Sequence, residues 1–255
     1  MDITILGGDA RLNALAALLR SEGRQAACAS DAETAKTLIP TSRLVVTQYP
    51  AKMDTDMETI LSLAPDSARI CLCGPGHWPE DGRVIDLWKD EALLQENAYL
   101  TAEGALSASM RAGQRSIRGL NCVVIGWGRI GSALAELLVA MGARVTVASG
   151  TEEHRKRALA RGAQAIPMEK LNAVLSGAGL VFSTPPAMVL DGERLRHVNR
   201  EAMLIDLASP PYGMDLKAAW RLGLRAWREP GLPGRYCPES AARAILKAMK
   251  RGRVL

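Results

Sequence analysis

The stretch from Asn121 to Ala148 constrains the fold of this chain most strongly. An apolar run at 122–125 (CVVI) ends at a glycine turn at 126–131 (GWGRIG), and an apolar helix pattern and a second β-like run follow directly. Strand, glycine turn, helix and strand is the order of a dinucleotide-binding unit. The first glycine permits the tight turn, the second lets the backbone approach a pyrophosphate, and the third lets the helix pack close to the strand. The turn therefore predicts nucleotide binding, with a Rossmann-like unit that has lost this function as the alternative.

The rest of the chain also alternates β-like and helical segments, which predicts an α/β fold. Residues 1–98 are expected to form a small flavodoxin-like domain, in which Asp31 begins a helix as its N-cap. A separate interdomain helix is expected within 99–118, with Thr101 as its N-cap. Residues 119–235 then form the Rossmann NAD(P)-binding domain, and 236–255 a closing helix that can cross back to the first domain.

Three turns of the second half are expected to meet at one edge of its sheet. They follow Ile125, Ser183 and Leu207, each at the end of an apolar run. In open parallel sheets, ligands bind outside the carboxyl ends of the strands, near the switch in strand order. The predicted cofactor-binding residues are Gly126, Trp127, Gly128, Arg129, Ile130, Gly131, Ser149, Gly150, Thr151, Thr184, Pro185, Ala208 and Ser209.

Composition favours a cytoplasmic α/β enzyme with an aliphatic core, since 48% of residues are hydrophobic and 4% aromatic. The chain starts directly as a strand without a leader, and its apolar runs are too short to span a bilayer. Five cysteines, an odd number, suggest reduced thiols, and we expect no metal site. The net charge of +5 is attributed to solvated helix faces, because a nucleic-acid-binding motif is lacking.

Five motifs together resemble the family of dipicolinate synthase A subunits: LGGDAR at 6–11, TAEG at 101–104, the GWGRIG turn, DLASPP at 206–211 and PGLPG at 230–234. The nucleotide half alone is also similar to D-2-hydroxyacid dehydrogenases. The resemblance implies an oxidoreductase subunit that converts dihydrodipicolinate to dipicolinate with NADP during sporulation. It also implies a location in the mother-cell cytoplasm, a homo-oligomer, and a partner in the flavoprotein-like B subunit of the synthase.

The cofactor can be argued from the end of the second strand of the nucleotide unit. NAD-specific sites usually carry an acid there, whereas this chain reads Ala148-Ser149-Gly150-Thr151, with no acid before Glu152. An acid would repel a 2′-phosphate, so its absence favours NADP and leaves NAD open. Members of the family carry Arg near the Gly150 position. The candidate substitutes here are Ser149, Thr151, Arg129 and Arg155.

A dicarboxylate substrate requires cationic groups and free N–H groups. Arg11 matches the family motif and is the first candidate for a carboxylate anchor, with a salt bridge to Asp9 as the alternative. Asp9 can orient Arg11, take a proton or only form the turn. Glu103 is a candidate base, or a first-turn carboxylate that complements the helix dipole. The predicted substrate-binding residues are Gly8, Arg11, Gly104, Gly231 and Pro233.

Several features keep other functions open. Pro210 stands where the family commonly carries Arg, which leaves one anionic contact in doubt. The three histidines, His77, His154 and His197, lie outside the matching motifs and are expected in a loop and on the surface. The alternatives are a D-2-hydroxyacid-dehydrogenase-like enzyme and a non-catalytic nucleotide-binding scaffold subunit. Small residues in the closing helix form one apolar face, which can serve domain packing, a homodimer or the contact with the B subunit; they are Ala241, Ala244, Ile245 and Ala248.

Overall fold

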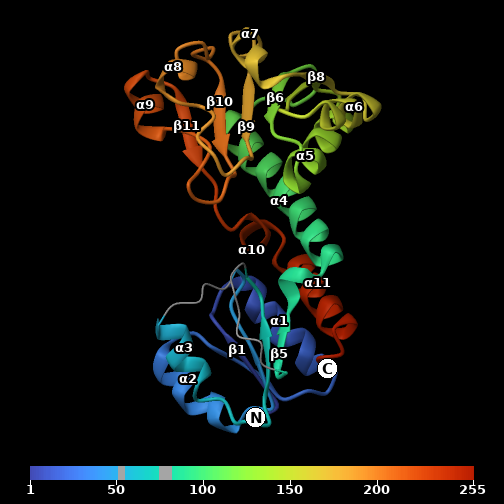
Figure 1. Ribbon diagram of the computed structural model, residues 1–255, viewed down its shortest axis with the longest axis vertical. Helices are drawn as coiled ribbons and strands as arrows, with labels where there is room; N and C mark the ends of the chain where they lie inside the picture. The colour runs from blue at the N-terminus through green and yellow to red at the C-terminus, as the bar shows by residue number, and fades with distance from the viewer. Residues whose placement is uncertain (51–54, 75–81) are drawn as a thin grey trace. The chain divides into compact units, whose positions relative to one another are not determined.

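The computed structural model describes residues 1–50, 55–74 and 82–255, and these divide into two compact units (Figure 1). The first unit contains Met1–Asn97 together with Pro233–Leu255, and the second contains Ala98–Leu232. His77 and most of the loop expected around it lie outside the described residues.

A five-stranded parallel sheet forms the centre of the first unit. Its order is β2-β1-β3-β4-β5, the arrangement of flavodoxin-like folds. The strands are β1 (Ile3–Leu6), β2 (Ala26–Ala29), β3 (Leu44–Val46), β4 (Arg69–Leu72) and β5 (Val84–Asp86). The register pairs Ile5 of β1 with Cys28 on one side and Val46 on the other. The prediction of an α/β class with two parallel sheets is confirmed.

Capped helices connect these strands. Asp9 caps α1 (Ala10–Ser21) by accepting from the Leu12 N–H, and Asp31 caps α2 (Ala32–Leu38) through the Thr34 N–H, as its sequence position predicts. The other helical elements of the unit are η1 (Ile39–Thr41), α3 (Thr55–Leu61), η2 (Leu87–Lys89) and α11 (Pro238–Arg251), with α10 (Leu232–Tyr236) at the boundary.

Helix α11 packs on α1 within the first unit. Its small apolar residues, Ala241, Ala244, Ile245 and Ala248, are at most 6% exposed. Ala244, Ile245 and Ala248 join Leu15 and Leu19 of α1 in one core cluster. The close approach of the two helices depends on these alanines. Domain packing therefore accounts for this apolar face, and the face is not free to form a homodimer or a contact with another protein.

The expected separate helix at Thr101 is wrong. Helix α4 runs without interruption from Glu91 to Gly113, and Asp90 accepts from the Leu93 N–H at its start. Thr101 is thus an interior helical residue and not an N-cap. Residues 92–100 (ALLQENAYL) contain neither glycine nor proline, so nothing in their sequence interrupts a helix that begins at Glu91.

The second unit has a six-stranded parallel sheet in the order β11-β10-β9-β6-β7-β8. This is the Rossmann order, with the switch between β6 and β9. The strands are β6 (Asn121–Ile125), β7 (Arg144–Ala148), β8 (Gln164–Ile166), β9 (Leu180–Ser183), β10 (Met203–Asp206) and β11 (Arg225–Arg228). The helical elements between them are α5 (Arg129–Ala140), α6 (Glu152–Ala160), η3 (Met168–Lys170), α7 (Leu171–Leu175), α8 (Gly192–Leu195) and α9 (Leu216–Arg221).

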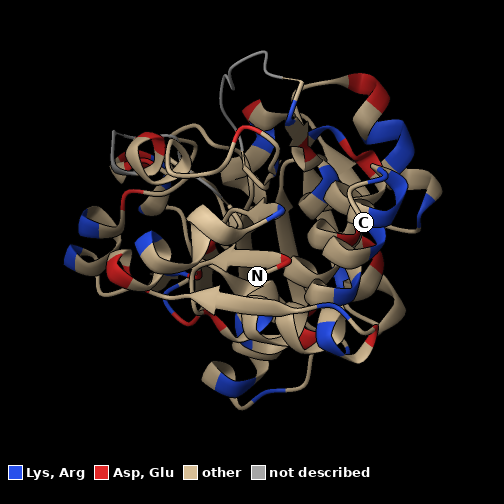
Figure 2. Cartoon of the chain, turned by 90° about the horizontal axis from the view of Figure 1, so that it is seen from below, with Lys and Arg blue, Asp and Glu red and all other residues tan. Residues whose placement is uncertain are grey.

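The charged side chains lie largely on helices, and acidic and basic residues share the same helices (Figure 2). On α6, Lys156 contacts Glu152 at 2.7 Å and Arg157 contacts Glu153 at 2.6 Å, both one helical turn apart. Such exposed pairs contribute little to stability. None of the helices in the described part of the chain is long and apolar enough to cross a membrane.

All five cysteines are free thiols. Cys122 lies on β6, the strand that precedes the glycine turn, and burial raises the pKa of its thiol to about 12. Cys71 and Cys73 are buried on one face of the first sheet, where the hydrogen bond between their side chains raises the pKa of Cys71. The raised pKa keeps the Cys122 and Cys71 thiols protonated at neutral pH, so these two are poor nucleophiles and poor metal ligands.

Arg251, at the end of α11, forms a two-pronged ion pair with Asp90, at the start of α4. Its Nε and one Nη each donate to a carboxylate oxygen at 2.8 Å, and these bonds lower the pKa of Asp90. A lowered carboxylate pKa stabilises the fold above the unfolded value of about 3.9, and the contribution is lost as pH falls through the folded value. Arg251→Gln should cost about 0.5–1 kcal/mol at pH 7, because Arg251 is half exposed and solvent screens the pair.

Urea unfolding of wild type and Arg251→Gln at pH 7 and pH 3 measures this difference, which should shrink at pH 3. Arg43→Gln is the matched control, since Arg43 lies 4.0 Å from Asp2 with its side chain 88% exposed. The control should unfold like wild type. A difference between Arg251→Gln and wild type that stays the same at both pH values would contradict the assigned pair.

Candidate functional site

The glycine turn joins β6 to α5 in the second unit. Gly126 has a φ of +94°, which favours glycine, and its N–H donates to Ala148 of the neighbouring strand. A Cβ on Gly131 would lie 2.4 Å from the carbonyl oxygen of Gly126, so this glycine lets α5 pack against the turn. The roles predicted for the first and third glycines match this geometry.

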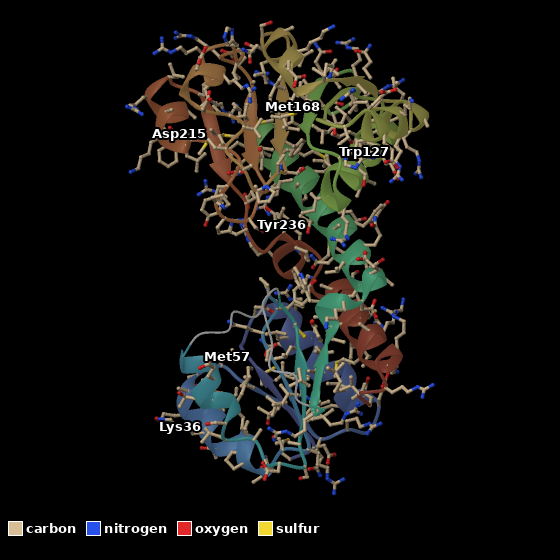
Figure 3. All side chains as sticks on the ribbon, in the orientation of Figure 1. Lys36, Met57, Trp127, Met168, Asp215 and Tyr236 are labelled. Atoms are coloured by element: carbon tan, nitrogen blue, oxygen red, sulfur yellow. The ribbon has the colours of Figure 1, made fainter. Side chains whose placement is uncertain are left out.

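The start of α5 is open to a ligand. Gly128 is the N-cap and has no side chain to accept from the first N–H groups of the helix. Apart from its two chain neighbours, no described residue has an atom within 4 Å of a Cβ built on Gly128. The first turn also lacks an acidic residue, so the positive end of the helix dipole is uncompensated. These features fit a bound phosphate group. Trp127, labelled in Figure 3, belongs to this turn and its side chain is buried.

The end of β7 is polar and partly closed. Ser149 is 4% exposed, and its hydroxyl lies 3.4 Å from Nδ1 of His154. Arg155 donates to the Ser149 carbonyl at 2.8 Å, so its guanidinium is held at the end of the strand. Thr151 caps α6 through the His154 N–H. His154 is therefore half-buried and bonded, not a plain surface residue as predicted, whereas His197 is exposed as expected.

The end of β9 touches the glycine turn directly. Thr184 donates its hydroxyl to the Ile125 carbonyl at 2.8 Å. A Cβ on Gly126 would lie 2.6 Å from the Thr184 hydroxyl and 3.1 Å from Pro185. The structure thus brings the predicted residues after β6 and β9 together. Ala208 and Ser209 follow β10, the next strand in the sheet.

A second polar cluster lies at the ends of β10 and β11, and sequence reasoning missed it. Asp206 is fully buried and accepts from the N–H groups of Ala208 and Gly213 and from Nε of Arg228. The Arg228 guanidinium lies 3.5 Å from the ring centroid of Tyr212. An acid that ends a buried strand, within DLASPP, was the available signal; Arg228 and Tyr212 fall outside the family motifs.

In the first unit, Arg11 of the GGDAR motif lies beside Gly234, the last residue of PGLPG. Arg11 is 5% exposed, donates to Asp9 at 2.7 Å and to the Tyr49 carbonyl, and lies 5.0 Å from the Tyr49 ring. A Cβ on Gly234 would be 3.7 Å from the Arg11 guanidinium carbon. Nε of Arg11 is buried and has no hydrogen-bond partner among the described residues. The Asp9 alternatives of turn formation and pairing with Arg11 are both observed.

The remaining predicted site residues lie on three elements. Glu103 is exposed, and Gly104 follows it in the interior of α4, so the first-turn role expected for Glu103 is wrong. Gly8 precedes α1, and a Cβ there would lie 2.9 Å from the side chain of Ser30. Gly231 has a φ of +66° and precedes Pro233 at the boundary of the units.

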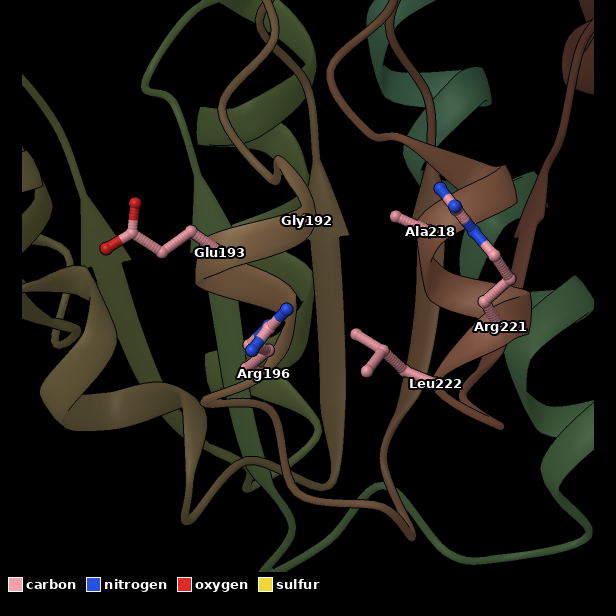
Figure 4. A pocket seen from close by; sticks show the side chains of 6 residues that line it. All are labelled: Gly192, Glu193, Arg196, Ala218, Arg221 and Leu222. Carbon is pink, nitrogen blue, oxygen red and sulfur yellow. The ribbon is translucent and has the colours of Figure 1, made fainter.

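One surface pocket of about 470 Å³ lies between α8 and α9 (Figure 4). Glu193 and Arg196 line it from the α8 side, and Ala218, Arg221 and Leu222 from the α9 side. It is open and contains none of the predicted site residues. The described residues do not include a group of three or more side chains suited to hold a metal ion.

Residues 84–209 match the family of the D-isomer specific 2-hydroxyacid dehydrogenase NAD binding domain. The A subunit of dipicolinate synthase from Bacillus subtilis is 27% identical over 169 residues. That alignment covers 66% of this chain and 57% of the relative, so the chain spans less than two thirds of it. These matches support an oxidoreductase-type role and a nicotinamide dinucleotide cofactor.

Solved structures share the fold. The A subunit of dipicolinate synthase from Bacillus halodurans superposes with a TM-score of 0.81 at 22% identity, over 98% of this chain and 96% of that one. D-lactate dehydrogenase from Escherichia coli gives a TM-score of 0.65 at 15% identity, over 98% and 95%. The resemblance predicted from the five motifs is confirmed: the chain is similar to the A subunit of dipicolinate synthase.

Proposed function

We propose that this chain is an NADP-dependent oxidoreductase subunit that converts dihydrodipicolinate to dipicolinate. The observation that carries the proposal is the open glycine turn at Gly128 in a chain whose motifs, sequence and fold are similar to the A subunit of dipicolinate synthase. The flavoprotein-like B subunit of that synthase is its proposed partner, and the cytoplasm of a sporulating mother cell its proposed location.

The proposed reaction requires little covalent chemistry from the protein itself. The dihydropyridine loses a hydride and a proton and becomes aromatic, so the product itself supplies the driving force. NADP serves as the hydride acceptor when bound. The chain has to hold the pyrophosphate at the start of α5, orient the ring and limit the access of water. Arg11 and Asp9 remain proposed substrate contacts, and Glu103 a proposed base, each on its match to a family motif.

Geometry at the end of β7 supports NADP over NAD. The position of the usual acid is occupied by Ser149, whose hydroxyl is near His154. Arg155 is tied to the Ser149 carbonyl and Thr151 caps α6, so a cation and a hydroxyl lie at the strand end where a ribose 2′-substituent binds. We propose that Arg155 replaces the arginine that relatives carry near Gly150.

Gly150→Arg should widen the preference for NADPH over NADH by about 10-fold or more, because a charge-assisted hydrogen bond is worth about 1.5–3 kcal/mol. Gly150 is exposed, and no described atom lies within 4 Å of a Cβ built there, so the new side chain has room. Arg155→Gln should narrow the same preference. Titrations of each variant with both nucleotides measure these shifts.

A matched control is Arg157→Gln, since Arg157 lies on the same helix but pairs with Glu153. It should leave both dissociation constants unchanged. Equal selectivity in wild type, Gly150→Arg and Arg155→Gln would mean that the 2′-phosphate is bound elsewhere or that the cofactor is NAD.

Product binding tests the substrate class. Protein saturated with NADPH should bind dipicolinate (pyridine-2,6-dicarboxylate) more tightly than lactate or pyruvate in calorimetric titrations. Tighter binding of the 2-hydroxy or 2-oxo acid would instead favour the D-2-hydroxyacid-dehydrogenase-like alternative, whose fold this chain shares.

A further inference from the structure

Arg228 ends β11 with a guanidinium held in one orientation. Its Nε donates to Oδ2 of Asp206 at 3.3 Å, and the ring of Tyr212 lies 3.5 Å from the guanidinium carbon. Its two terminal nitrogens make no hydrogen bond to any residue that the structure describes. The side chain is 28% exposed, so these nitrogens form a reachable donor pair. A planar guanidinium with two parallel donors matches a carboxylate.

Buried hydrogen bonds and a tight turn hold the residues that contact Arg228. Asp206 is fully buried, and its oxygens also accept from Ala208 and Gly213 of the loop that follows β10. Within this loop, a Cβ on Gly213 would lie 2.2 Å from the Ser183 hydroxyl, so only glycine fits there. Tyr212 precedes it with a φ of +73°, a backbone conformation that costs energy in a residue other than glycine. The strained turn fixes the tyrosine ring beside the guanidinium.

A second buried polar group lies beside Gly213 of this loop. The Ser183 hydroxyl at the end of β9 is fully buried and has no hydrogen-bond partner among the described residues. Such a group costs stability, and a functional role is one of the explanations for its presence. The next residue, Glu229, accepts from the Trp227 indole at 3.1 Å.

The position of Arg228 in the strand order indicates which part of a bound ligand it can contact. In the order β11-β10-β9-β6-β7-β8, the phosphate-binding turn follows β6 and the adenosine side lies toward β7 and β8. Arg228 and Asp206 lie on the other half, three and two strands from β6, where the nicotinamide and the substrate belong. Neighbouring strands are about 4.8 Å apart, so Arg228 is too distant to contact the pyrophosphate.

From these observations we infer that Arg228 binds one carboxylate of the substrate, with Asp206 and Tyr212 as positioning residues. The inference rests on the proposed function and names a contact of that site. Arg228 stands opposite Asp206 on the neighbouring strand, so its guanidinium reaches the turn that follows β10.

The test uses NADPH-saturated protein and dipicolinate as the probe. Arg228→Gln should weaken dipicolinate binding about 10- to 100-fold, the range for a lost charge-assisted bond, and change the NADPH dissociation constant less than about twofold. Tyr212→Ala should weaken it less, and Tyr212→Phe should bind like wild type because the ring remains. Arg221→Gln removes the same charge from exposed α9 and should leave dipicolinate binding unchanged.

A merely structural role predicts a different pattern. It would lower the thermal midpoint and weaken NADPH and dipicolinate together, and that result overturns the inference. Wild-type affinity for dipicolinate in Arg228→Gln also overturns it, while leaving the proposed function intact. If wild type binds pyruvate and not dipicolinate, and Arg228→Gln loses pyruvate, then Arg228 is a carboxylate anchor and the proposed substrate is wrong.

Discussion

Gly128→Val should abolish nucleotide binding while leaving the protein folded. A Cβ at this position meets no described atom within 4 Å, and the φ of −78° is open to any residue, so the free protein tolerates valine. The branched side chain would occupy the space over the start of α5 where a pyrophosphate has to approach. We expect NADPH to bind at least about 100-fold more weakly, which corresponds to about 2.7 kcal/mol.

Gly131→Val is the matched variant in the same turn, and it should lower the folding stability of the protein. The new Cβ would lie 2.4 Å from the Gly126 carbonyl oxygen, so α5 or the turn has to shift. Such overpacking typically costs about 1–3 kcal/mol of folding free energy. Urea unfolding with parallel NADPH titration separates the two variants. A folded Gly128→Val protein with wild-type affinity would rule out this turn as the cofactor site.

Arg11→Ala should lower the free energy of unfolding by about 3 kcal/mol. The guanidinium is buried, and it holds both the Asp9 carboxylate and the Tyr49 carbonyl. Truncation removes these charge-assisted bonds, worth about 1.5–3 kcal/mol each, and leaves a void beside Tyr49 and Gly234. Urea unfolding measures the loss, and dipicolinate titration of the folded fraction measures any loss of substrate affinity.

Arg20→Ala is the control for this position. Arg20 lies on the same helix, is exposed and makes one bond, to the Ala26 carbonyl. It should cost less than about 1 kcal/mol. Equal stabilities of Arg11→Ala and Arg20→Ala would show that the buried cluster contributes no more than an ordinary surface bond. Arg11→Lys keeps the charge, so a dipicolinate defect in that variant would indicate the planar fork of arginine as the required feature.

Local signals in the sequence were enough to predict the two sheets. Short apolar runs mark the buried parallel strands, several of them ending at glycine or proline turns. The Asp31 N-cap and the Gly126 turn depend only on neighbouring residues. The start of α4 was harder to predict from the sequence. Thr101 is a residue type that often caps helices, but it lies inside the uninterrupted helix Glu91–Gly113. Propensity alone did not decide between the two starts.

The site was predicted only where a backbone motif defines it. Glycines that allow a turn or a close approach are visible in the sequence, whereas the Arg228 cluster depends on a strand pairing that joins Asp206 to Arg228 across 22 residues. Burial likewise changes the role that can be assigned to Arg11. Its position in GGDAR suggests a free cation, but the fold encloses it between Asp9 and Tyr49.

The most direct test of the central claim is turnover of freshly prepared dihydrodipicolinate with NADP, with and without the B subunit from the same organism. We expect NADPH and dipicolinate to appear in equal amounts, and we expect Gly128→Val to form neither. Absence of both products under either condition, from protein that binds NADPH, would contradict the dipicolinate-forming assignment and leave the D-2-hydroxyacid-dehydrogenase-like enzyme and the nucleotide-binding scaffold as the two alternatives.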